Sequence, residues 1–220
     1  KHPTPALITT ALTKALSGLS QYPATAGTIE LRRAIAGWLT RRYGLKRISP
    51  ETQILTINGS REALFAIAQV VLNVQQGTPK PYVISPNPFY QIYEGAALLG
   101  GAIPYYLNES ERTAFAPDYD SVPESVWNRV QLLYTCSPAN PSGRVMQLND
   151  WKRLFELSDR YGFVIAADEC YSELYLDESS PPLGALQAAQ MLGRDEYPRL
   201  LVFTSLSKRS NVPGMRSGFV

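Results

Sequence analysis

The sequence predicts an α/β fold in which a mostly parallel sheet is covered by helices. Apolar runs at 163–167 and 200–204 lack a polar alternation, which is typical of strands buried on both faces. Amphipathic segments of helical length alternate with such runs, and this order favours parallel strands joined by helices. Ligands of such sheets bind beyond the carboxyl ends of the strands, so polar residues that directly follow strands are candidates for a site.

Each element follows from periodicity and turn residues. The first helix is expected at 28–43, because Ile29, Ile35 and Leu39 mark an apolar face and Gly44 is a typical helix end. Further helices are expected at 62–72, 90–99 and 148–161. Strands are expected at 53–57, 82–84, 102–106, 130–135, 163–167, 200–204 and 217–220. The polar, proline-containing segments 108–129 and 177–198 are interpreted as connections with little chemistry.

Composition excludes several classes of function. The 21 basic and 19 acidic residues give a net charge of +2 without a basic cluster, so nucleic acid and membrane partners are not expected. No apolar run has the length of a membrane span, and the first residues do not resemble a signal peptide. Cys136 and Cys170 lie in apolar runs and are interpreted as free thiols, which predicts a cytoplasmic protein. With His2 as the only histidine, a histidine-based metal site and a Ser-His-Asp hydrolase are disfavoured.

Lys208 is the candidate nucleophile. It follows the apolar run 200–204 in Ser205-Leu206-Ser207-Lys208, and a Pro-Gly turn and Arg216 come next. We expect a partly desolvated amine beside other cations, whose lowered pKa would let it attack a carbonyl. Ser205 and Arg216 could together hold a dianionic phosphate. A carbonyl and a phosphate on one small molecule describe pyridoxal 5'-phosphate.

Asp168 and Tyr171 follow the apolar run 163–167. A buried carboxylate needs a cationic partner, and a protonated pyridine nitrogen would serve. Tyr171 could then reach the phenolic oxygen of the same ring. Taken alone, an Asp in this position more often caps the next helix.

Three further signals are weaker on their own. The amide of Asn140, in Asn140-Pro141-Ser142-Gly143, could bind the same phenolic oxygen, although this motif is also a common turn. The helix start at Ser60 and Arg61 could bind an anion through its amides, and the alternative is that Ser60 simply caps the helix. Tyr90 could stack on a flat ring, while an aromatic there is more often part of the core.

The order and spacing of these signals resemble the fold-type I pyridoxal-phosphate enzymes, specifically the class I/II aminotransferases. The resemblance spans nearly all 220 residues. It rests on the turn Tyr22 to Gly27 with Leu31-Arg32, on Gly59-Ser60, Tyr90, Asn140-Pro141 and Asp168 with Tyr171, and on Ser205-x-Ser207-Lys208 with Arg216. It implies the aspartate-aminotransferase-like fold, and residues 1–220 are then the large cofactor-binding domain, truncated at both ends, without the C-terminal small domain.

The resemblance also implies a role for each residue. Lys208 looks like the lysine that binds the cofactor and moves the proton at the substrate's α carbon. Asp168 would pair with the pyridine nitrogen, Tyr171 and Asn140 would hold the phenolic oxygen, and Tyr90 would stack on the ring. The phosphate would be held by the amides of Ser60 and Arg61, the Ser205 hydroxyl and Arg216. Tyr22 is similar to a tyrosine that reaches the phosphate of the neighbouring subunit, which implies a homodimer.

The segments 86–96 and 205–219 resemble one subgroup, the N-succinyldiaminopimelate aminotransferases of bacterial lysine biosynthesis, and 159–163 and 168–171 agree with it. The resemblance implies transfer of an amino group from glutamate to N-succinyl-2-amino-6-oxopimelate. Other amino acid and 2-oxo acid pairs, a carbon–sulfur lyase and a non-catalytic cofactor-sensing domain of a transcriptional regulator stay open. Because the family's carboxylate-binding arginine lies in the small domain, residues 1–220 alone are expected to be inactive.

Overall fold

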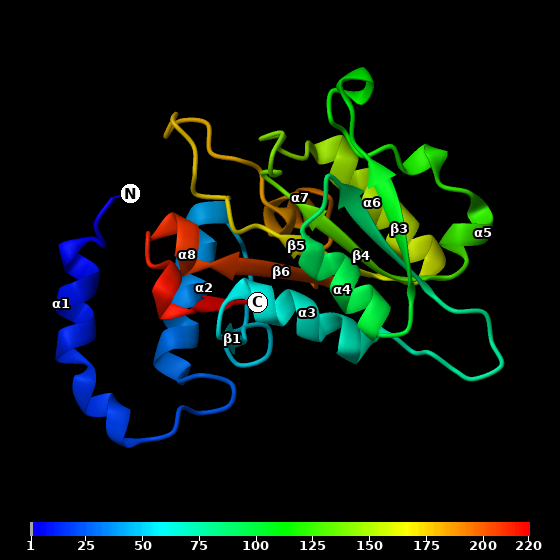
Figure 1. Cartoon of the computed structure of the whole chain (residues 1–220). Coiled ribbons are helices and arrows are strands. Elements are labelled where there is room, and N and C mark those ends of the chain that lie inside the picture. The colour runs from blue at the N-terminus through cyan, green and yellow to red at the C-terminus, as the bar shows by residue number, and fades with distance from the viewer. Residues whose placement is uncertain (1) are drawn as a thin grey trace.

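The computed structural model describes residues 2–220, which form a seven-stranded sheet between two layers of helices (Figure 1). The strand order is β1-β7-β6-β5-β4-β2-β3, and β7 alone runs antiparallel to its neighbours. The predicted mostly parallel sheet is therefore confirmed. The strands are β1 (Thr56–Ile57), β2 (Tyr82–Asn87), β3 (Ile103–Asn108), β4 (Val130–Cys136), β5 (Val164–Asp168), β6 (Leu200–Ser205) and β7 (Gly218–Phe219).

Two apolar clusters hold the layers together. On one face, Leu132 and Tyr134 of β4 pack with the helices α3 (Ser60–Val71) and α4 (Gln91–Leu99). Successive side chains of a strand point to opposite faces, so Leu133 packs on the other face, in a cluster with four further helices. The helices that contribute to this second cluster are α2 (Ile29–Tyr43), α5 (Glu124–Trp127), α6 (Leu148–Tyr161) and α7 (Ala185–Met191).

The predicted helix 148–161 has the observed bounds of α6, and its ends show why. Asp150 accepts a hydrogen bond from the backbone N–H of Gln147 at 2.8 Å, so the first turn is capped. Gly162 ends the helix with a left-handed φ of 79°. By contrast, the strand expected at 53–57 is reduced to β1, because its partner β7 offers only two paired residues.

The segments 108–129 and 177–198 connect strands as expected, but both contain helical elements that were not predicted. The segment 177–198 contains α7, whose buried face consists largely of alanines that give a weak periodic signal. The segment 108–129 contains α5 and two 3-10 turns, Glu111–Thr113 and Tyr119–Ser121.

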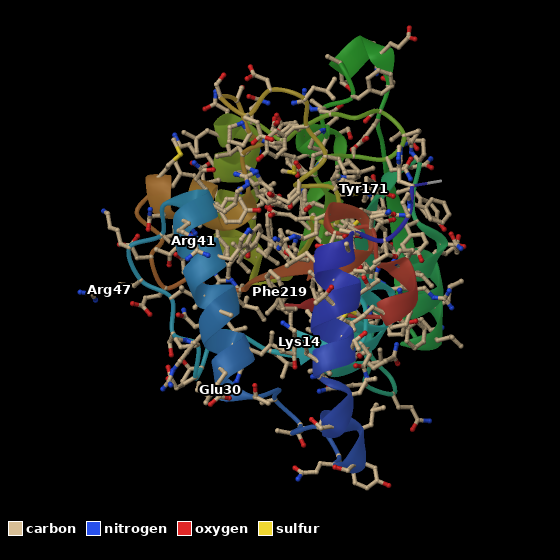
Figure 2. The ribbon with its side chains drawn as sticks, turned by 90° about the vertical axis from the view of Figure 1, so that its left-hand side faces the viewer. Lys14, Glu30, Arg41, Arg47, Tyr171 and Phe219 are labelled. Atoms are coloured by element: carbon tan, nitrogen blue, oxygen red, sulfur yellow. The ribbon has the colours of Figure 1, made fainter. Side chains whose placement is uncertain are left out.

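The first helix, α1 (Ala6–Lys14), has no buried residue and was not predicted. It is followed by the 3-10 helix η1 (Leu16–Ser20), and both stand away from the sheet (Figure 1). Figure 2 shows α1, with Lys14, in front of the molecule beside α2, which carries Glu30 and Arg41. The residues that precede α1 are anchored by Asn211, whose side-chain amide donates to the carbonyls of His2 and Pro3, both at 3.0 Å. Among residues 2–220, no helix is long and apolar enough to cross a membrane.

Candidate active site

The candidate residues meet at the carboxyl edge of three neighbouring strands. Cys136, the last residue of β4, is the register partner of Asp168, the last residue of β5. Asp168 is in turn opposite Phe203 of β6. The short helix α8 (Leu206–Arg209) follows β6 and carries Lys208. The topology thus places Asp168 and Lys208 at one edge, as expected for ligand sites of parallel sheets.

Asp168 is buried with an exposed fraction of 4%. Its Oδ2 accepts a hydrogen bond from the Tyr93 hydroxyl at 2.9 Å, and its Oδ1 accepts one from the backbone N–H of Cys170 at 3.2 Å. Burial raises the pKa of Asp168, and the two hydrogen bonds oppose this rise. The alternative that Asp168 caps a helix is wrong, because turns and no helix follow it at 169–173.

Asn140 and Tyr171 lie side by side, as the shared phenolic-oxygen role requires. The side-chain amide of Asn140 donates to the Tyr171 hydroxyl at 3.3 Å. Burial raises the pKa of Tyr171, so this hydroxyl keeps its proton at neutral pH and can itself donate. One N–H of the Asn140 amide and the Tyr171 hydroxyl can therefore both donate a hydrogen bond to the same acceptor oxygen.

The start of α3 faces Arg216. Gly59 is its N-cap residue, with φ 92° and no side-chain cap, and Ser60 is the first helical residue. The alternative that Ser60 caps the helix is therefore wrong. A Cβ on Gly59 would lie 2.2 Å from Nη2 of Arg216, so only glycine allows this approach. Arg216 Nη2 lies 2.7 Å from Oε2 of Glu62, in the first turn of α3.

Ser205 and Arg61 complete this end of the site. Ser205 is 2% exposed, and its hydroxyl oxygen caps α8 by accepting the N–H of Ser207 at 3.0 Å. Its hydroxyl proton stays available for an outside acceptor. Nε of Arg61 lies 3.8 Å from Oε1 of Glu62, and the Arg61 side chain is 64% exposed.

Lys208 is exposed, so the expected partial desolvation of its amine was wrong. The reason is local: Lys208 lies on α8, a four-residue helix that begins directly after β6 and has no buried residue. The positive charge of Lys208 nevertheless acts on Cys170, where it opposes the burial that raises the pKa of that thiol. Lys208 is therefore close to the residues that follow Asp168.

Tyr90 is half-buried, with its ring centroid 5.8 Å from that of Tyr93 in an edge-to-face contact. Burial raises the pKa of Tyr90, and the charges of Arg61 and Asp168 both act on it. Tyr90 thus lies between the helix start and the buried acid. Tyr22 is fully exposed and takes part in none of these contacts.

These residues fit pyridoxal 5'-phosphate on three observations. Within residues 2–220, no basic side chain forms an ion pair with the buried Asp168, which suits a protonated ring nitrogen. The start of α3 at Ser60 and Arg61, which has no side-chain cap, and the nearby Arg216 suit a phosphate. The Asn140 and Tyr171 pair suits an oxygen acceptor between these two ends.

Sequence reasoning assigned no role to two residues of the site, Tyr93 and Glu62. Tyr93 follows Tyr90 by three residues at the start of α4, and this spacing on one helix face was the available signal. Glu62 lies two residues after Ser60, and an acid in the first turn is ordinary for a helix, so nothing marked it as the partner of Arg216.

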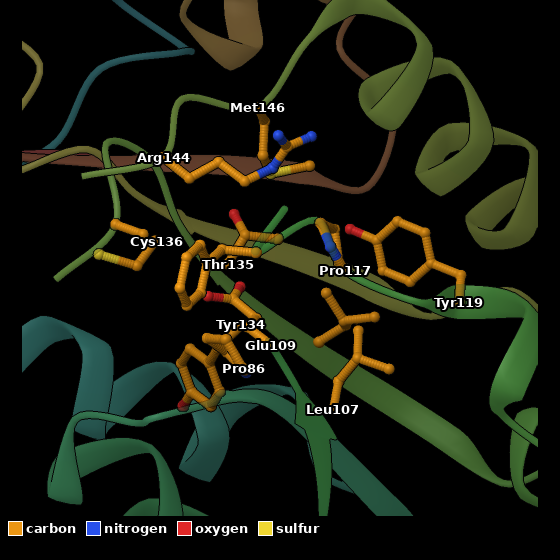
Figure 3. A pocket seen from close by; sticks show the side chains of 13 residues that line it. Pro86, Leu107, Glu109, Pro117, Tyr119, Tyr134, Thr135, Cys136, Arg144 and Met146 are labelled. Atoms are coloured by element: carbon orange, nitrogen blue, oxygen red, sulfur yellow. The ribbon is translucent and has the colours of Figure 1, made fainter. Parts of the chain in front are cut away.

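A small cavity of about 20 Å³ lies beside the Asn140 loop (Figure 3). Glu109 and Arg144 face it, together with Thr135 of β4 (Figure 3). Burial raises the pKa of Glu109 to about 7, and the charge of Arg144 opposes this shift. Arg144 also binds Asp150 through Nη2 at 2.7 Å, so it links the cavity to the start of α6. The segment 108–129 therefore carries a partly buried ionisable group that shares a cavity with Cys136 and Ala139.

Comparison with known proteins agrees with this geometry. The family model described as "Aminotransferase class I and II" matches residues 1–220. An LL-diaminopimelate aminotransferase of Aquifex aeolicus is 33% identical over 218 residues, which are 98% of this chain and 53% of that protein. The chain thus spans about half the length of the curated relatives it matches.

Solved structures show the same fold. An aminotransferase of Neisseria meningitidis superposes with a TM-score of 0.94 at 56% identity, over 100% of this chain and 55% of that one. An aminotransferase of Helicobacter pylori superposes with a TM-score of 0.89 at 36% identity, over 100% and 56%. The predicted resemblance is confirmed, and the chain belongs to the class I and II aminotransferases, a family that depends on pyridoxal phosphate.

Proposed function

We propose that this polypeptide catalyses pyridoxal-phosphate-dependent transamination between an amino acid and a 2-oxo acid. The observation that carries the proposal is the buried carboxylate of Asp168, which forms no ion pair within residues 2–220, at the same sheet edge as Lys208 and the Asn140–Tyr171 pair. When bound, pyridoxal phosphate supplies a ring that withdraws electrons from the substrate's α carbon.

We assign the other steps of the reaction to individual residues of this chain. With the cofactor bound, Nζ of Lys208 would hold it until substrate arrives, and would then remove and return the proton at the substrate's α carbon. Asp168 would keep the ring nitrogen protonated, and Tyr90 would stack on the ring.

Asn140 and Tyr171 donate to the phenolic oxygen. The phosphate is held by the amides of Ser60 and Arg61, the Ser205 hydroxyl and the Arg216 guanidinium. Arg216 and the α3 start offer opposite charge to the dianion, which makes these contacts charge-assisted.

For the substrate, we propose transfer from glutamate to N-succinyl-2-amino-6-oxopimelate in diaminopimelate and lysine biosynthesis. The segments 86–96 and 205–219, which resemble that subgroup, support the assignment. The curated relatives carry the name LL-diaminopimelate aminotransferase, which shares the diaminopimelate skeleton and is the alternative. Rates with the succinylated and the free substrate, measured side by side, separate the two.

We further propose that residues 1–220 form the large cofactor-binding domain of a homodimer in the cytoplasm. The coverage of about half of each relative supports a domain assignment. The fully exposed Tyr22 is free to reach a second copy, which supports a shared site. The free thiols of Cys136 and Cys170 suit a reducing compartment.

The testing experiment is an absorbance spectrum of the full-length gene product, before and after addition of glutamate, with Lys208→Ala alongside. We expect a visible band of bound cofactor that glutamate converts to the amine form in the wild type and not in the variant. A band that ignores glutamate would redirect the assignment to another amino donor, a lyase or a regulator. A folded protein without a band after addition of cofactor would overturn the proposal.

A further inference from the structure

Tyr93 contacts the most deeply buried charged group of the site. Its hydroxyl donates to Oδ2 of Asp168 at 2.9 Å, and the exposed fractions of the two residues are 1% and 4%. Tyr93 belongs to α4 and Asp168 to β5, so this bond joins a helix to the sheet edge. Sequence reasoning and family resemblance assigned no role to Tyr93.

The bond does more than satisfy a buried hydroxyl. A carboxylate must be ionised to hold a protonated ring nitrogen, whereas burial favours the neutral acid and raises the pKa of Asp168. A donated hydrogen bond stabilises the charged form, and Tyr93 is the largest contributor among those that lower this pKa. Tyr93 therefore acts against the effect of burial before any ligand is present.

The same bond fixes the direction of the carboxylate. Oδ1 is held by the N–H of Cys170 at 3.2 Å and Oδ2 by Tyr93, so both oxygens are constrained. Each oxygen keeps a second lone pair, which can face the ring nitrogen.

Tyr93 is itself held in place. Its ring stacks on Tyr134, with centroids 4.5 Å apart and an interplanar angle of 13°. The Tyr134 hydroxyl donates to the carbonyl of Leu64 in α3 at 2.7 Å. Burial, and then the charge of Asp168, raise the pKa of Tyr93 well above its ordinary value, so its hydroxyl stays a donor across the working pH range.

We propose that Tyr93 is a positioning residue that holds the Asp168 carboxylate charged and oriented toward the cofactor's ring nitrogen, an inference that rests on the proposed function. The charge of Asp168 also raises the pKa of titratable groups in the elements packed around it. They are Cys136 at the end of β4, Glu169, Cys170 and Tyr171 after β5, and Tyr90 beside α4. Each of them is unchanged in the variants below.

The test compares Tyr93→Phe with Tyr134→Phe in the full-length gene product. Each substitution removes one buried hydroxyl oxygen and keeps the stacked pair of rings, but only the first oxygen contacts Asp168. The dissociation constant of pyridoxal phosphate is measured by absorbance titration of the apoprotein, over a series from acidic to alkaline pH. Thermal unfolding of both apoproteins reports the purely structural cost.

For Tyr93→Phe we expect about tenfold weaker cofactor binding at neutral pH, since a hydrogen bond to a charged group is lost. The acidic limb of the affinity profile is expected to move to higher pH, because Asp168 takes up its proton earlier. Tyr134→Phe is expected to lose stability without moving this limb. In an Asp168→Ala background, Tyr93→Phe is expected to change the affinity no further.

Two results overturn the proposal in different ways. If the wild type binds cofactor and Tyr93→Phe has the same affinity profile, Tyr93 is a structural residue only and the proposed function stands. If the folded wild type does not bind cofactor at any pH, the proposed function fails, and the role of Tyr93 fails with it.

Discussion

The two ends of the candidate site are built differently. At the deep end, Asp168 is 4% exposed and is held by the neutral donors Tyr93 and Cys170. At the open end, the side chains of Arg216 and Glu62 are 43% and 52% exposed and form an ion pair with each other. Among the described residues 2–220, no basic side chain pairs with the Asp168 carboxylate at the deep end, whereas at the open end Arg216 and Glu62 pair with each other.

This difference indicates what each end of the site contributes to cofactor binding and to the reaction. A buried carboxylate without a cation is ready for one, so binding a protonated ring requires no rearrangement there. At the open end, a phosphate competes with Glu62 for Arg216. Because an exposed ion pair contributes only about 0–1 kcal/mol, replacing Glu62 by phosphate costs little free energy. We expect both ends to contribute to retention of the cofactor, and only the deep end to govern the chemistry at the substrate's α carbon.

The largest effect is expected for Asp168→Asn. The amide keeps the shape of the side chain but cannot stabilise a protonated ring, so turnover is expected to fall by about a hundredfold or more. Initial rates at saturating cofactor measure this. The control is Asp177→Asn, which removes an exposed acid that binds only Ser179. Turnover within a few-fold of wild type would contradict the assigned role of Asp168.

Arg216→Met is expected to weaken pyridoxal-phosphate binding by about ten- to a hundredfold, because a charge-assisted contact to phosphate is lost. Pyridoxal, which lacks the phosphate, serves as the matched ligand and is expected to bind wild type and variant alike. Titration of both proteins with both ligands gives the comparison. Equal losses for the two ligands would show that Arg216 supports the site without contacting phosphate.

Glu62→Gln tests the internal ion pair. Desolvation is the largest single influence on Glu62 and raises its pKa, but the hydrogen bond from Arg216, a backbone hydrogen bond and the charges of Arg216 and Arg61 together lower the pKa, so the carboxylate is charged at neutral pH. Removing this competitor is expected to raise the affinity for inorganic phosphate and for the cofactor by a few-fold. Calorimetric titration with phosphate measures the change. Weaker binding in the variant would mean that Glu62 orients Arg216 for the phosphate.

The smallest effect concerns stability at Glu109. Burial raises the pKa of Glu109 from 4.5 to about 7, so folding favours the protonated acid. Stability from this group is complete below pH 4.5 and is lost as the pH rises to about 7. Because Glu109 is partly exposed, Glu109→Gln is expected to stabilise the protein by only about 1 kcal/mol above pH 7.

Chemical denaturation well below and well above pH 7 measures this effect. Glu111→Gln, an exposed neighbour in the same segment, is the control. A stability difference between the Glu109 variant and wild type that does not change with pH would contradict the shifted titration.

The sequence was sufficient for elements whose signals are local. The bounds of α6 follow from its capping residues and its apolar face, and the residues after β4, β5 and β6 were candidates because ligands bind at strand ends. Family resemblance was needed to combine these signals. The family resemblance rests on the order of Asn140, Asp168 and Lys208 along the chain. No local pattern would have assigned a role to any of the three.

What the sequence did not predict depends on distant contacts. Tyr93 and Asp168 are 75 residues apart, and their bond exists only because α4 packs on the sheet over β2 and β3, near the end of β5. The exposure of Lys208 depends on the turn that α8 makes after β6. The raised pKa of Glu109 depends on burial beside Thr135 and Arg144, which a polar, proline-containing segment does not reveal.

The exposed first helix has a consequence for how assembly can be followed. A nine-residue helix without buried residues is marginal in water, because isolated helices shorter than about 12–15 residues lack the cooperativity to persist. The leucines Leu7, Leu12, Leu16 and Leu19 are all exposed along α1 and η1. If the proposed second copy covers them, amide hydrogen exchange in 6–14 slows as protein concentration rises, while exchange in the sheet does not change.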